Sequence, residues 1–313
     1  MKINDRVHQL RVQFNITPEI TRYVYVYIIT GKKGCYLVDA GVKGCDKKIE
    51  EYIHKIGKNR ENINAVLLTH SHPDHIGALK TIKEMYSCCV YASRGERDWI
   101  EDIDLQYEKR PIPGFYSLVD GSVTVDRILS DGDLLCLEPG ITIQVIGAPG
   151  HSRESLCFYY REQKILFTGD IGAFTENQLI KNDIDCDYLK VAHHGSKNSS
   201  SPEFLSVSSP KSSIISCGYK NRYNHPHKDV LDRIKSTGSD VFRTDLQGNI
   251  MLRINKFEEK IIGFREIDGN LLGLLNFYFM DILNIIMYLL GFFVLVKIRK
   301  DSVIDLDFIE EEL

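Results

Sequence analysis

Residues 65–75 of this 313-residue chain read AVLLTHSHPDH, an apolar run followed at once by three histidines and an aspartate. The apolar part is short and bounded by polar residues, which predicts a buried strand. Ligand sites in open α/β sheets gather at the carboxyl ends of strands, and this cluster begins there. Imidazole with carboxylate is a donor set for zinc and is compatible with iron and manganese. The stretch therefore predicts a metal site in a loop that follows a strand.

Four further stretches, taken together with this one, resemble a known family. They are CYLVDAG at 35–41, APGHS at 148–152, ILFTGD at 165–170 and VAHHGS at 191–196. With the HxHxDH pattern at 70–75, they follow the order of the metallo-β-lactamase superfamily across most of residues 1–265. Each match is short, but their combination in this order is highly specific. The resemblance implies a metal-dependent hydrolase whose catalytic domain covers residues 1–265.

The resemblance also implies the fold, a mixed α/β (α+β) four-layer αββα sandwich with two sheets face to face and helices outside. The pattern of the sequence agrees with this fold. Strands are predicted near 23–29, 65–69, 88–92, 141–146, 157–160, 165–169, 213–217 and 249–254, and helices near 46–56, 75–86 and 227–236. Residues 93–126 lack clear periodicity, and we interpret them as a surface excursion or as an insertion at the mouth of the site.

The resemblance implies a set of metal ligands for two divalent ions, zinc first, with manganese or iron as alternatives. They are His70, His72 and His151 for one ion, Asp74, His75 and His194 for the other, and Asp170 between the two. Two ions that share a water lower its pKa toward neutrality, and Asp74 is also expected to orient that water. Asp39 is interpreted equally as a turn carboxylate and as a group that orients a ligand.

The late ligand has two possible assignments. His193 and His194 are adjacent, so their side chains point in different directions unless the loop bends sharply. We assign His194 as the metal ligand and His193 as a catalytic group that faces the substrate or supports a ligand. The reverse assignment stays open at this point.

The two halves of the catalytic region resemble different branches of the superfamily. Residues 20–172 are similar to glyoxalase II-type members, which implies hydrolysis of thioesters or related esters such as lactones. Residues 165–265 are similar to the metallo-β-lactamase domain of ComEC-type DNA-internalisation proteins, through the stretches 189–201, 221–227 and 242–250. This second resemblance implies hydrolysis of phosphodiesters. Transport of DNA does not carry over, because no multi-span channel is present in the sequence.

Charge supports an anionic substrate. The chain has a formal net charge of −4, but residues 190–265 alone carry 13 basic and 7 acidic residues. A local basic surplus beside a metal site favours a phosphate ester or a nucleic acid. The candidate substrate-binding residues are Lys197, Arg222, His225 and His227, with Lys220 and Arg243 as further basic residues in predicted loops. A solvated surface is the equally weighted alternative for each basic residue.

The loop 195–201 also has two interpretations. It is rich in Ser, Asn and Lys, and its backbone N–H groups are candidates for cradling a phosphate. Alternatively, it is the entry to a helix, with Ser201 as N-cap and Pro202 at the first helical position.

The C-terminal region changes the expected localisation. Residues 271–296 form an apolar run in which Asp281 is the single charge. As a helix it would span about 39 Å, enough for a bilayer core of about 30 Å. We therefore expect a transmembrane anchor, a basic-then-acidic tail at 297–313, and a catalytic domain in the cytoplasm, since no signal peptide is visible. The alternative is a soluble cytoplasmic protein whose amphipathic helix packs on the domain or on a second copy in a homodimer.

These observations lead to one functional prediction and two alternatives. We expect a membrane-anchored dinuclear metallohydrolase that acts as a phosphodiesterase or nuclease. A thioester or lactone hydrolase is the first alternative. The second is a regulatory module that binds metal without catalysis, and the complete set of ligands argues against it.

Overall fold

The computed structural model describes residues 6–17, 20–58, 63–182, 184–218, 221, 223–247, 249–254 and 259–264. The chain divides into two compact units, and the description below concerns the first of them, Met1–Gly263. The predicted membrane helix at 271–296 and the tail at 297–313 lie outside the described residues. Within the described ranges, no helix has the length and apolarity needed to cross a bilayer.

The first sheet contains six strands in the order of the sequence. They are β1 (Val7–Thr17), β2 (Ile20–Thr30), β3 (Cys35–Val38), β4 (Ile63–Leu67), β5 (Cys89–Ser93) and β6 (Arg127–Leu129). The first three strands pair antiparallel, and β3 to β6 pair parallel. All four side chains of β3 are buried, as expected for a parallel strand that is covered on both faces.

The second sheet contains seven strands in the order β13-β12-β11-β10-β9-β8-β7. They are β7 (Leu134–Glu138), β8 (Ile141–Gly147), β9 (Leu156–Tyr160), β10 (Ile165–Phe167), β11 (Tyr188–Lys190), β12 (Ser212–Ile215) and β13 (Asp240–Arg243). As in the first sheet, the strands that come first in the sequence, β7 to β10, pair antiparallel. The later strands, β10 to β13, pair parallel. A separate pair, β14 (Asn249–Ile254) and β15 (Glu259–Phe264), completes the strands.

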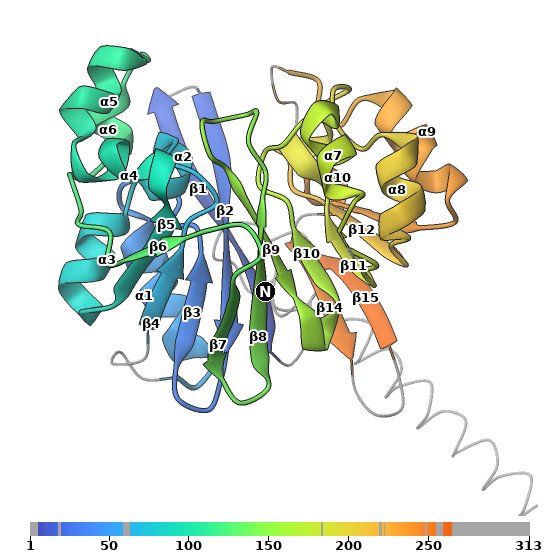
Figure 1. Ribbon diagram of the computed structural model, residues 1–313, viewed down its shortest axis with the longest axis horizontal. Helices are drawn as coiled ribbons and strands as arrows, with labels where there is room; N and C mark the ends of the chain where they lie inside the picture. The colour runs from blue at the N-terminus through green and yellow to red at the C-terminus, as the bar shows by residue number, and fades with distance from the viewer. Residues whose placement is uncertain are drawn as a thin grey trace, which may run out of the picture. The chain divides into compact units, whose positions relative to one another are not determined.

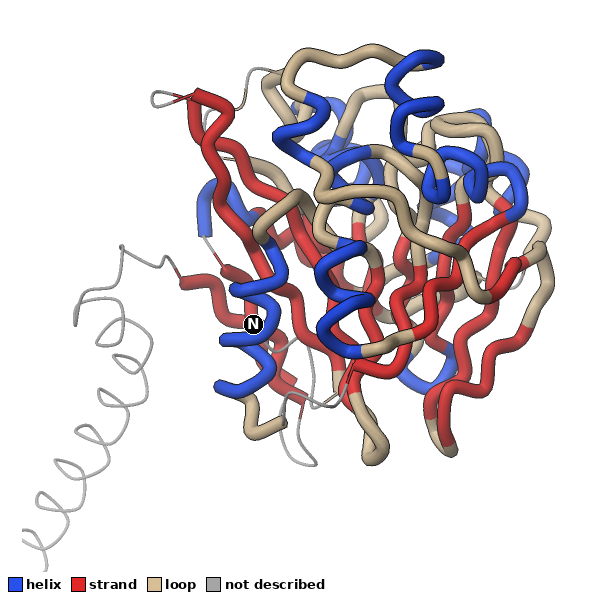
Figure 2. The backbone as a smooth tube through the Cα atoms, turned by 90° about the vertical axis from the view of Figure 1, so that its left-hand side faces the viewer, coloured by secondary structure: helices blue, strands red, loops and turns tan. Residues whose placement is uncertain are grey.

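The sheets face each other, and helices cover their outer faces (Figure 1). Tyr27 of β2 packs edge-to-face on Phe167 of β10, with ring centroids 5.1 Å apart, which shows contact between the sheets. Two helices, α1 (Cys45–Lys55) and α3 (Leu79–Tyr86), cover the outer face of the first sheet (Figure 2). Their apolar residues join Val26, Ile28 and Val66 in one core. On the second sheet, α7 (Ala173–Leu179), α8 (Pro202–Ser208) and α9 (Lys228–Ser236) bury their apolar faces in a second core.

This topology brings the loops of the site together. In both sheets the parallel strands β3, β4, β10, β11 and β12 end at the same edge, so the loops that follow them are neighbours. Short elements lie at this edge. They are α2 (Pro73–Ile76), α4 (Arg94–Glu101), α5 (Ile103–Lys109), α6 (Phe115–Leu118), α10 (Thr244–Gln247) and the 3-10 turn η3 (Ala192–Gly195). Another 3-10 turn, η2 (Arg161–Gln163), follows β9. The order of strands therefore places every predicted ligand stretch at one edge of the sandwich.

The fold confirms the predicted mixed α/β sandwich, with two local differences. The helix predicted at 75–86 is two helices, α2 and α3, separated at Gly77. The Gly77 N–H donates to the Gly41 carbonyl at 2.6 Å instead of continuing the helix. A Cβ at Gly77 would lie 2.2 Å from the Leu118 carbonyl oxygen, so only glycine fits there. The other difference is the stretch 93–126, which contains α4, α5 and α6 rather than an irregular excursion.

Candidate metal centre

Three histidine side chains from two loops converge on one point, and we call them the first cluster: His70, His72 and His151. His70 and His72 follow β4, and His151 lies between β8 and β9. The Nε2 atom of His70 lies 2.9 Å from Nδ1 of His72, and Nε2 of His151 lies 3.0 Å from the same atom. One nitrogen from each ring lies within 4.8 Å of the other two. Three imidazoles in this arrangement match a zinc-type donor set.

The electrostatics of the first cluster also fit a cation. Burial and the neighbouring imidazoles lower the pKa of His72 to about 2. Burial lowers the pKa of His151 to about 4, and it lowers that of His70 well below the usual range. All three rings are therefore neutral at physiological pH, and neutral imidazole is the form that binds metal. The Nδ1 atom of His70 is held by Thr69 Oγ1 at 3.0 Å, which directs Nε2 toward the cluster.

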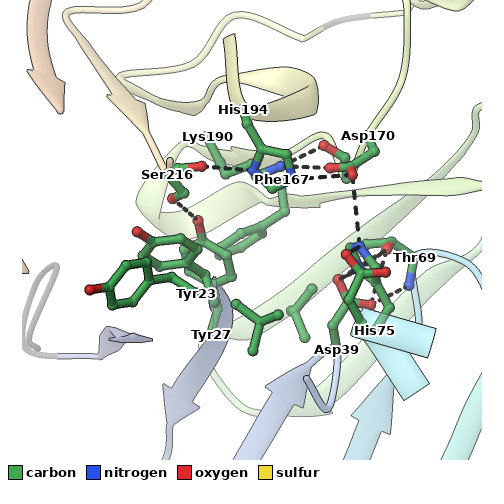
Figure 3. A pocket seen from close by; sticks show the side chains of 15 residues that line it. Tyr23, Tyr27, Asp39, Thr69, His75, Phe167, Asp170, Lys190, His194 and Ser216 are labelled. Atoms are coloured by element: carbon green, nitrogen blue, oxygen red, sulfur yellow. Dashed lines mark hydrogen bonds and ion pairs between the residues drawn. The ribbon is translucent and has the colours of Figure 1, made fainter. Parts of the chain in front are cut away.

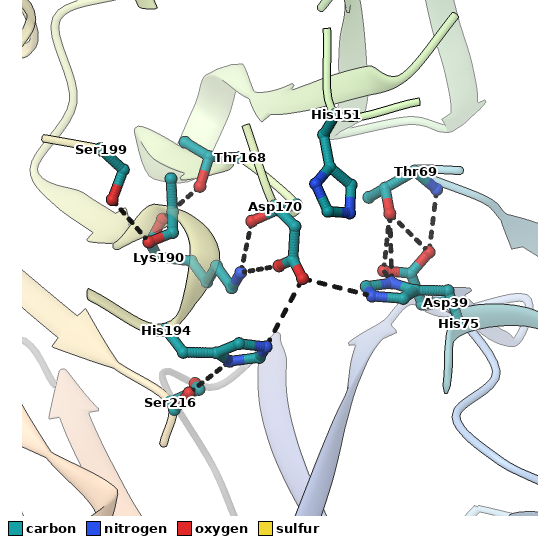
Figure 4. Close-up of polar contacts among 12 residues, drawn as sticks. Asp39, Thr69, His75, His151, Thr168, Asp170, Lys190, His194, Ser199 and Ser216 are labelled. Atoms are coloured by element: carbon teal, nitrogen blue, oxygen red, sulfur yellow. Dashed lines mark hydrogen bonds and ion pairs between the residues drawn. The ribbon is translucent and has the colours of Figure 1, made fainter. Parts of the chain in front are cut away.

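A second cluster is built around Asp170, which faces His75 and His194 (Figure 4). Asp74 completes it beside His75, and the His75 ring lies 4.0 Å from the His70 ring of the first cluster by their centroids. The Oδ2 atom of Asp170 lies 3.9 Å from Nε2 of His75 and 3.5 Å from Nε2 of His194. Nε2 of His75 lies 3.8 Å from the Asp74 carboxylate, whose side chain is 44% exposed. Ligands of a tetrahedral zinc ion, at bond lengths of about 2.1 Å, lie about 3.4 Å apart. The donor atoms of the second cluster therefore have nearly the spacing of ligands to one ion.

Each histidine of the second cluster is oriented by an acceptor behind it. Nδ1 of His75 lies 2.8 Å from Asp39 Oδ2, and Nδ1 of His194 lies 2.7 Å from the Ser216 carbonyl oxygen. These contacts leave both Nε2 atoms facing Asp170, an arrangement common behind metal-binding histidines. Asp39 also accepts the Thr69 N–H at 2.8 Å. Of its two interpretations, the geometry supports the one in which Asp39 orients a ligand.

The second cluster carries charge, unlike the first. Burial opposes protonation of His75, but Asp39 and Asp74 outweigh it and raise its pKa well above the usual range. Burial likewise opposes protonation of His194, and Asp170 reverses this and raises the His194 pKa. Burial opposes ionisation of Asp170, but His194 and Lys190 hold its pKa well below the usual range. The ionised Asp170 carboxylate is therefore compensated by the protonated His75 ring and the Lys190 ammonium group.

Lys190 is a functional candidate that the sequence prediction missed. It ends β11 and is buried, with Nζ 3.3 Å from Asp170 Oδ1 and donating to the Gly169 carbonyl at 2.5 Å. One carboxylate oxygen of Asp170 thus faces the lysine while the other faces His75 and His194. A lysine inside the otherwise apolar stretch YLKVA was the available signal, because lysine is almost never buried unless it is paired.

The late loop bends sharply at its two histidines. His193 has φ 46° and His194 has φ 56°, so both residues adopt the left-handed conformation that L side chains rarely take. The bend separates their ring centroids by 6.2 Å. His194 turns to Asp170, while His193 faces His151 with centroids 5.1 Å apart. This placement agrees with His194 as the predicted ligand and His193 as the group beside the substrate.

The loop 195–201 is the entry to a helix and not a phosphate cradle. Ser201 Oγ accepts the Phe204 N–H and caps α8, which begins at Pro202. The backbone N–H groups of residues 196–201 all donate within the protein, to His193, His227, Ser196 and Glu176. Arg233 of α9 fixes the carbonyls of the same loop. With its donors already engaged, the loop cannot bind phosphate through its backbone.

The predicted substrate-binding residues have different environments. Lys197 is exposed, and its N–H donates to His227 Nδ1 at 3.2 Å. The His225 ring lies 5.9 Å from His193, beside the centre. Arg222 and Lys220 lie outside the described residues. Arg243 forms a two-point ion pair with Asp245, at 2.6 and 3.1 Å, which accounts for its position in the fold without a phosphate.

The second cluster opens into a pocket between the sheets (Figure 3). One wall is formed by Tyr23, Tyr25 and Tyr27, which share a face of β2 because they occupy alternate positions. The hydroxyl of Tyr27 lies 3.1 Å from Ser216 Oγ, and that of Tyr25 lies 2.7 Å from Thr244 Oγ1. Burial raises the pKa of both phenols. The pocket is therefore neutral and aromatic on one side and ionised on the other.

Comparison with known proteins agrees with this geometry. The profile of the Metallo-beta-lactamase superfamily matches residues 20–219. The chain belongs to the metallo-β-lactamase superfamily. Members of this superfamily are mostly hydrolases that bind metal ions, usually zinc. The two-layered β core and the ligand loops at one edge are this superfamily's fold in the present chain.

Individual relatives confirm both resemblances within the superfamily. ComE operon protein 3 of Bacillus subtilis (strain 168) is 28% identical over 206 residues, which are 63% of this chain and 25% of that protein. The probable metallo-hydrolase YqgX of the same organism is 30% identical over 148 residues, 46% of this chain and 64% of YqgX. Hydroxyacylglutathione hydrolase GloC of Haemophilus influenzae is 26% identical over 141 residues, 45% of this chain and 62% of GloC. The chain thus spans between a quarter and just under two thirds of these relatives.

Proposed function

We propose that this chain is a metal-dependent hydrolase with a two-ion centre, and that it cleaves phosphodiester bonds in DNA or in a nucleotide-like ester. The observation that carries the proposal is the adjacency of the two clusters. The ring centroids of His70 and His75, one from each cluster, lie 4.0 Å apart. Two ions held at neighbouring clusters can act on the same ester. The two donor sets fit divalent ions, as argued above from their spacing and charge.

The residues divide into those that hold ions and those that face the substrate. His70, His72 and His151 would hold one ion, Asp74, His75 and His194 the other, with Asp170 between them. Bound divalent ions would supply Lewis-acid polarisation of the ester and would acidify water at neutral pH. The half-exposed Asp74 carboxylate would also accept a proton from the attacking water. His193, whose pKa burial lowers, lies beside His151, and we assign it to donate a hydrogen bond to a substrate oxygen.

Charge around the centre supports a phosphodiester. Residues 190–265 carry the local basic surplus, and they include the loops that contact His193 and His194. Lys197 is exposed beside His227 and is able to reach a phosphate oxygen. His225 lies between these residues and the centre, 5.0 Å from His227 by ring centroids. We assign Lys197, His225 and His227, together with Arg222, to substrate binding.

A specific observation favours a second candidate function. The chain is similar to a protein named hydroxyacylglutathione hydrolase GloC over 141 residues, which are 45% of the present chain. A thioester hydrolase would use the same ions and would place its acyl or thiol portion against the aromatic wall of the pocket. The two candidates therefore differ in substrate and not in the metal centre.

The test compares both substrate classes on one preparation. The full-length chain, purified in detergent and loaded with Zn²⁺ or Mn²⁺, is assayed on single-stranded DNA, bis-p-nitrophenyl phosphate and a glutathione thioester. The variant His72→Ala/Asp74→Ala, which removes a ligand from each cluster, serves as the blank. We expect metal-dependent diester cleavage that the variant lacks. Thioester turnover without diester cleavage would assign the second function, and no turnover of either class would favour a non-catalytic metal-binding module.

We further propose that the apolar run 271–296 anchors the chain in a membrane, with the catalytic domain on the cytoplasmic side. Its length and its single charge support this proposal. Expression of the full chain and of the chain ending at residue 266, followed by carbonate extraction of membranes, is the test. The full chain should remain in the membrane pellet. Its release by carbonate would show that the run does not span the bilayer.

A further inference from the structure

One buried carboxylate outside both clusters connects the two loops that carry the first cluster. Glu96, in the first turn of α4, is 2% exposed. Its Oε2 atom accepts the backbone N–H of Ser71 at 3.0 Å and also the Ser71 hydroxyl. Its Oε1 atom accepts the Ser152 hydroxyl at 2.6 Å and the Glu154 N–H at 3.0 Å. Ser71 lies between His70 and His72, and Ser152 follows His151, so one side chain bridges both ligand loops.

The chemistry of the contact requires a carboxylate. All four groups that face Glu96 are donors, two of them backbone N–H groups that cannot reverse their direction. A carboxylate accepts at both oxygens, whereas the amide of glutamine would direct its NH₂ group at one of the backbone N–H groups. A buried donor left without an acceptor is costly. The contact is therefore specific to glutamate and not merely to a side chain of that size.

Additional contacts fasten the same helices to the same two loops. Glu154 also contacts α4 through its side chain, because its carboxylate accepts the Gly95 N–H at the start of that helix. The Arg153 guanidinium lies over the Trp99 ring, 5.2 Å from its centroid. On the other loop, the Gln106 side chain of α5 donates to the Ser71 carbonyl at 2.6 Å. The segment from α4 to α5 thus holds the backbone on both sides of the first cluster.

The bridge connects the two sheets at the metal centre. The loop with His70 and His72 extends from β4 of the first sheet, while the loop with His151 extends from β8 of the second. The Leu156 N–H also donates to the Thr69 carbonyl at 2.8 Å, at the base of both loops. That backbone bond and the two apolar cores are independent of Glu96. Loss of the Glu96 bridge should therefore loosen the ligand loops without unfolding the domain.

We propose that Glu96 is a positioning residue of the metal centre, which fixes the spacing of His70 and His72 relative to His151. It acts through Ser71 and Ser152 and touches no metal ligand side chain. The inference rests on the proposed function, because it requires that the first cluster binds a metal. Preorganisation of ligands by partners one contact away contributes about 10- to 100-fold to metal affinity. We expect a contribution of that size from Glu96.

The experiment measures zinc affinity in the full-length chain by competition with a chromophoric chelator. Glu96→Gln and Glu96→Ala should weaken zinc binding at the first cluster by about 10- to 100-fold. Glu101→Gln is the matched control, since Glu101 lies on the same helix but accepts the Val125 N–H and pairs with Arg97, remote from the ligand loops. The control should leave zinc affinity unchanged. Thermal unfolding of the metal-free variants establishes that they are folded.

Two further measurements separate positioning from general stability. Cobalt bound at the first cluster should show a shifted visible absorption spectrum in Glu96→Gln, because the spectrum reports ligand geometry, and an unchanged one in Glu101→Gln. Ser152→Ala removes one of the four donors and should weaken zinc binding by a few-fold, with no additional loss in the Glu96→Gln background. Trp99 is the only tryptophan in the sequence and lies at this junction, so its fluorescence should report zinc binding there.

The outcomes distinguish this inference from the proposal beneath it. Folded Glu96 variants that bind zinc as tightly as the wild-type chain, with an unchanged cobalt spectrum, would overturn the positioning role alone. A wild-type chain that binds no zinc or cobalt would overturn the proposed function and the positioning role together. If Glu96→Ala fails to fold, Glu96→Gln and Ser152→Ala decide the question, because they change a few atoms only.

Discussion

The first and second clusters lie side by side at one edge of the sandwich, but they prepare for a cation in different ways. The first cluster has three imidazoles whose pKa values burial holds low, so it is neutral and needs no proton release. The second cluster has an ionised Asp170 already surrounded by His75, His194 and Lys190. A metal ion at the second cluster must therefore displace protons that stabilise the metal-free protein. We therefore expect the first cluster to bind zinc before the second.

The strongest test of this contrast removes Asp170, the residue around which the second cluster is built. Asp170→Ala should lower phosphodiester hydrolysis by about a thousand-fold, because changes one contact away from a metal already cost about 10- to 100-fold. Zinc content, measured by elemental analysis, should fall from two ions per chain toward one. Asp185→Ala, which breaks an exposed pair with Lys164, is the control and should retain full activity. Full activity in Asp170→Ala would show that Asp170 has no role in the metal centre.

The buried Lys190 allows the second cluster to be tested through the stability of the fold. Lys190→Met leaves the Asp170 carboxylate buried with less compensation, and it should lower the free energy of unfolding of the metal-free chain by about 3 kcal/mol. Zinc should restore much of this loss, because a cation beside Asp170 replaces the ammonium group. Urea unfolding with and without zinc measures both effects. Lys211→Met, at an exposed pair with Asp187, should change stability by less than about 1 kcal/mol. Equal effects of the two substitutions would contradict the assigned role of Lys190.

A more selective substitution is possible at Asp39, the carboxylate that orients His75 in the second cluster. Asp39→Asn keeps a residue that tolerates the left-handed backbone at this position, where φ is 63°. It weakens the acceptor behind His75 Nδ1 and should lower zinc affinity at the second cluster by about 10- to 100-fold. The first cluster should lose less affinity than the second, in contrast to Glu96→Gln, because Asp39 reaches His70 only through the Thr69 hydroxyl. Chelator competition resolves the two binding events. Loss of affinity at the first cluster alone would reverse our assignment.

The mildest perturbation, which changes no residue, is the pH of the zinc titration. The pKa values of His75 and His194 are raised, so protons compete with zinc at the second cluster as the pH falls through those values. Affinity there should fall by about tenfold per pH unit for each proton displaced. At the first cluster the pKa of His72 is about 2 and that of His151 about 4, so affinity should change little between about pH 7 and about pH 5. Zinc titrations across this range would show the opposite trend if the first cluster were the charged one.

How much the sequence predicted depended on how local the signal was. The HxHxDH stretch, the Pro-Gly-His loop and the Thr-Gly-Asp strand end all carry their chemistry within a few residues. Their order resembles that of the metallo-β-lactamase superfamily, and this resemblance implied the sandwich; the structure brings these residues together. The left-handed bend at His193 and His194 depends on φ angles that no motif specifies, so the sequence alone did not show which of the two rings turns to Asp170.

The contacts that the sequence could not predict join remote segments. Glu96 reaches Ser71 and Ser152 from a helix in the stretch 93–126, where no periodicity had suggested a role. Glu176 occupies the N–H groups of the loop at 200–201, which the sequence left available for phosphate. Such contacts follow from tertiary packing, which places side chains distant in sequence beside one another. Composition and local spacing contain no record of them.

We have proposed that two ions, one at each cluster, act together on a phosphodiester. The most direct measurement is a zinc titration of the metal-free, full-length chain with hydrolysis of bis-p-nitrophenyl phosphate followed after each addition. We expect little hydrolysis after the first equivalent of zinc, which fills the first cluster. Hydrolysis should rise steeply as the second equivalent binds. Full activity at one equivalent, or none after two equivalents have bound, would contradict this proposal.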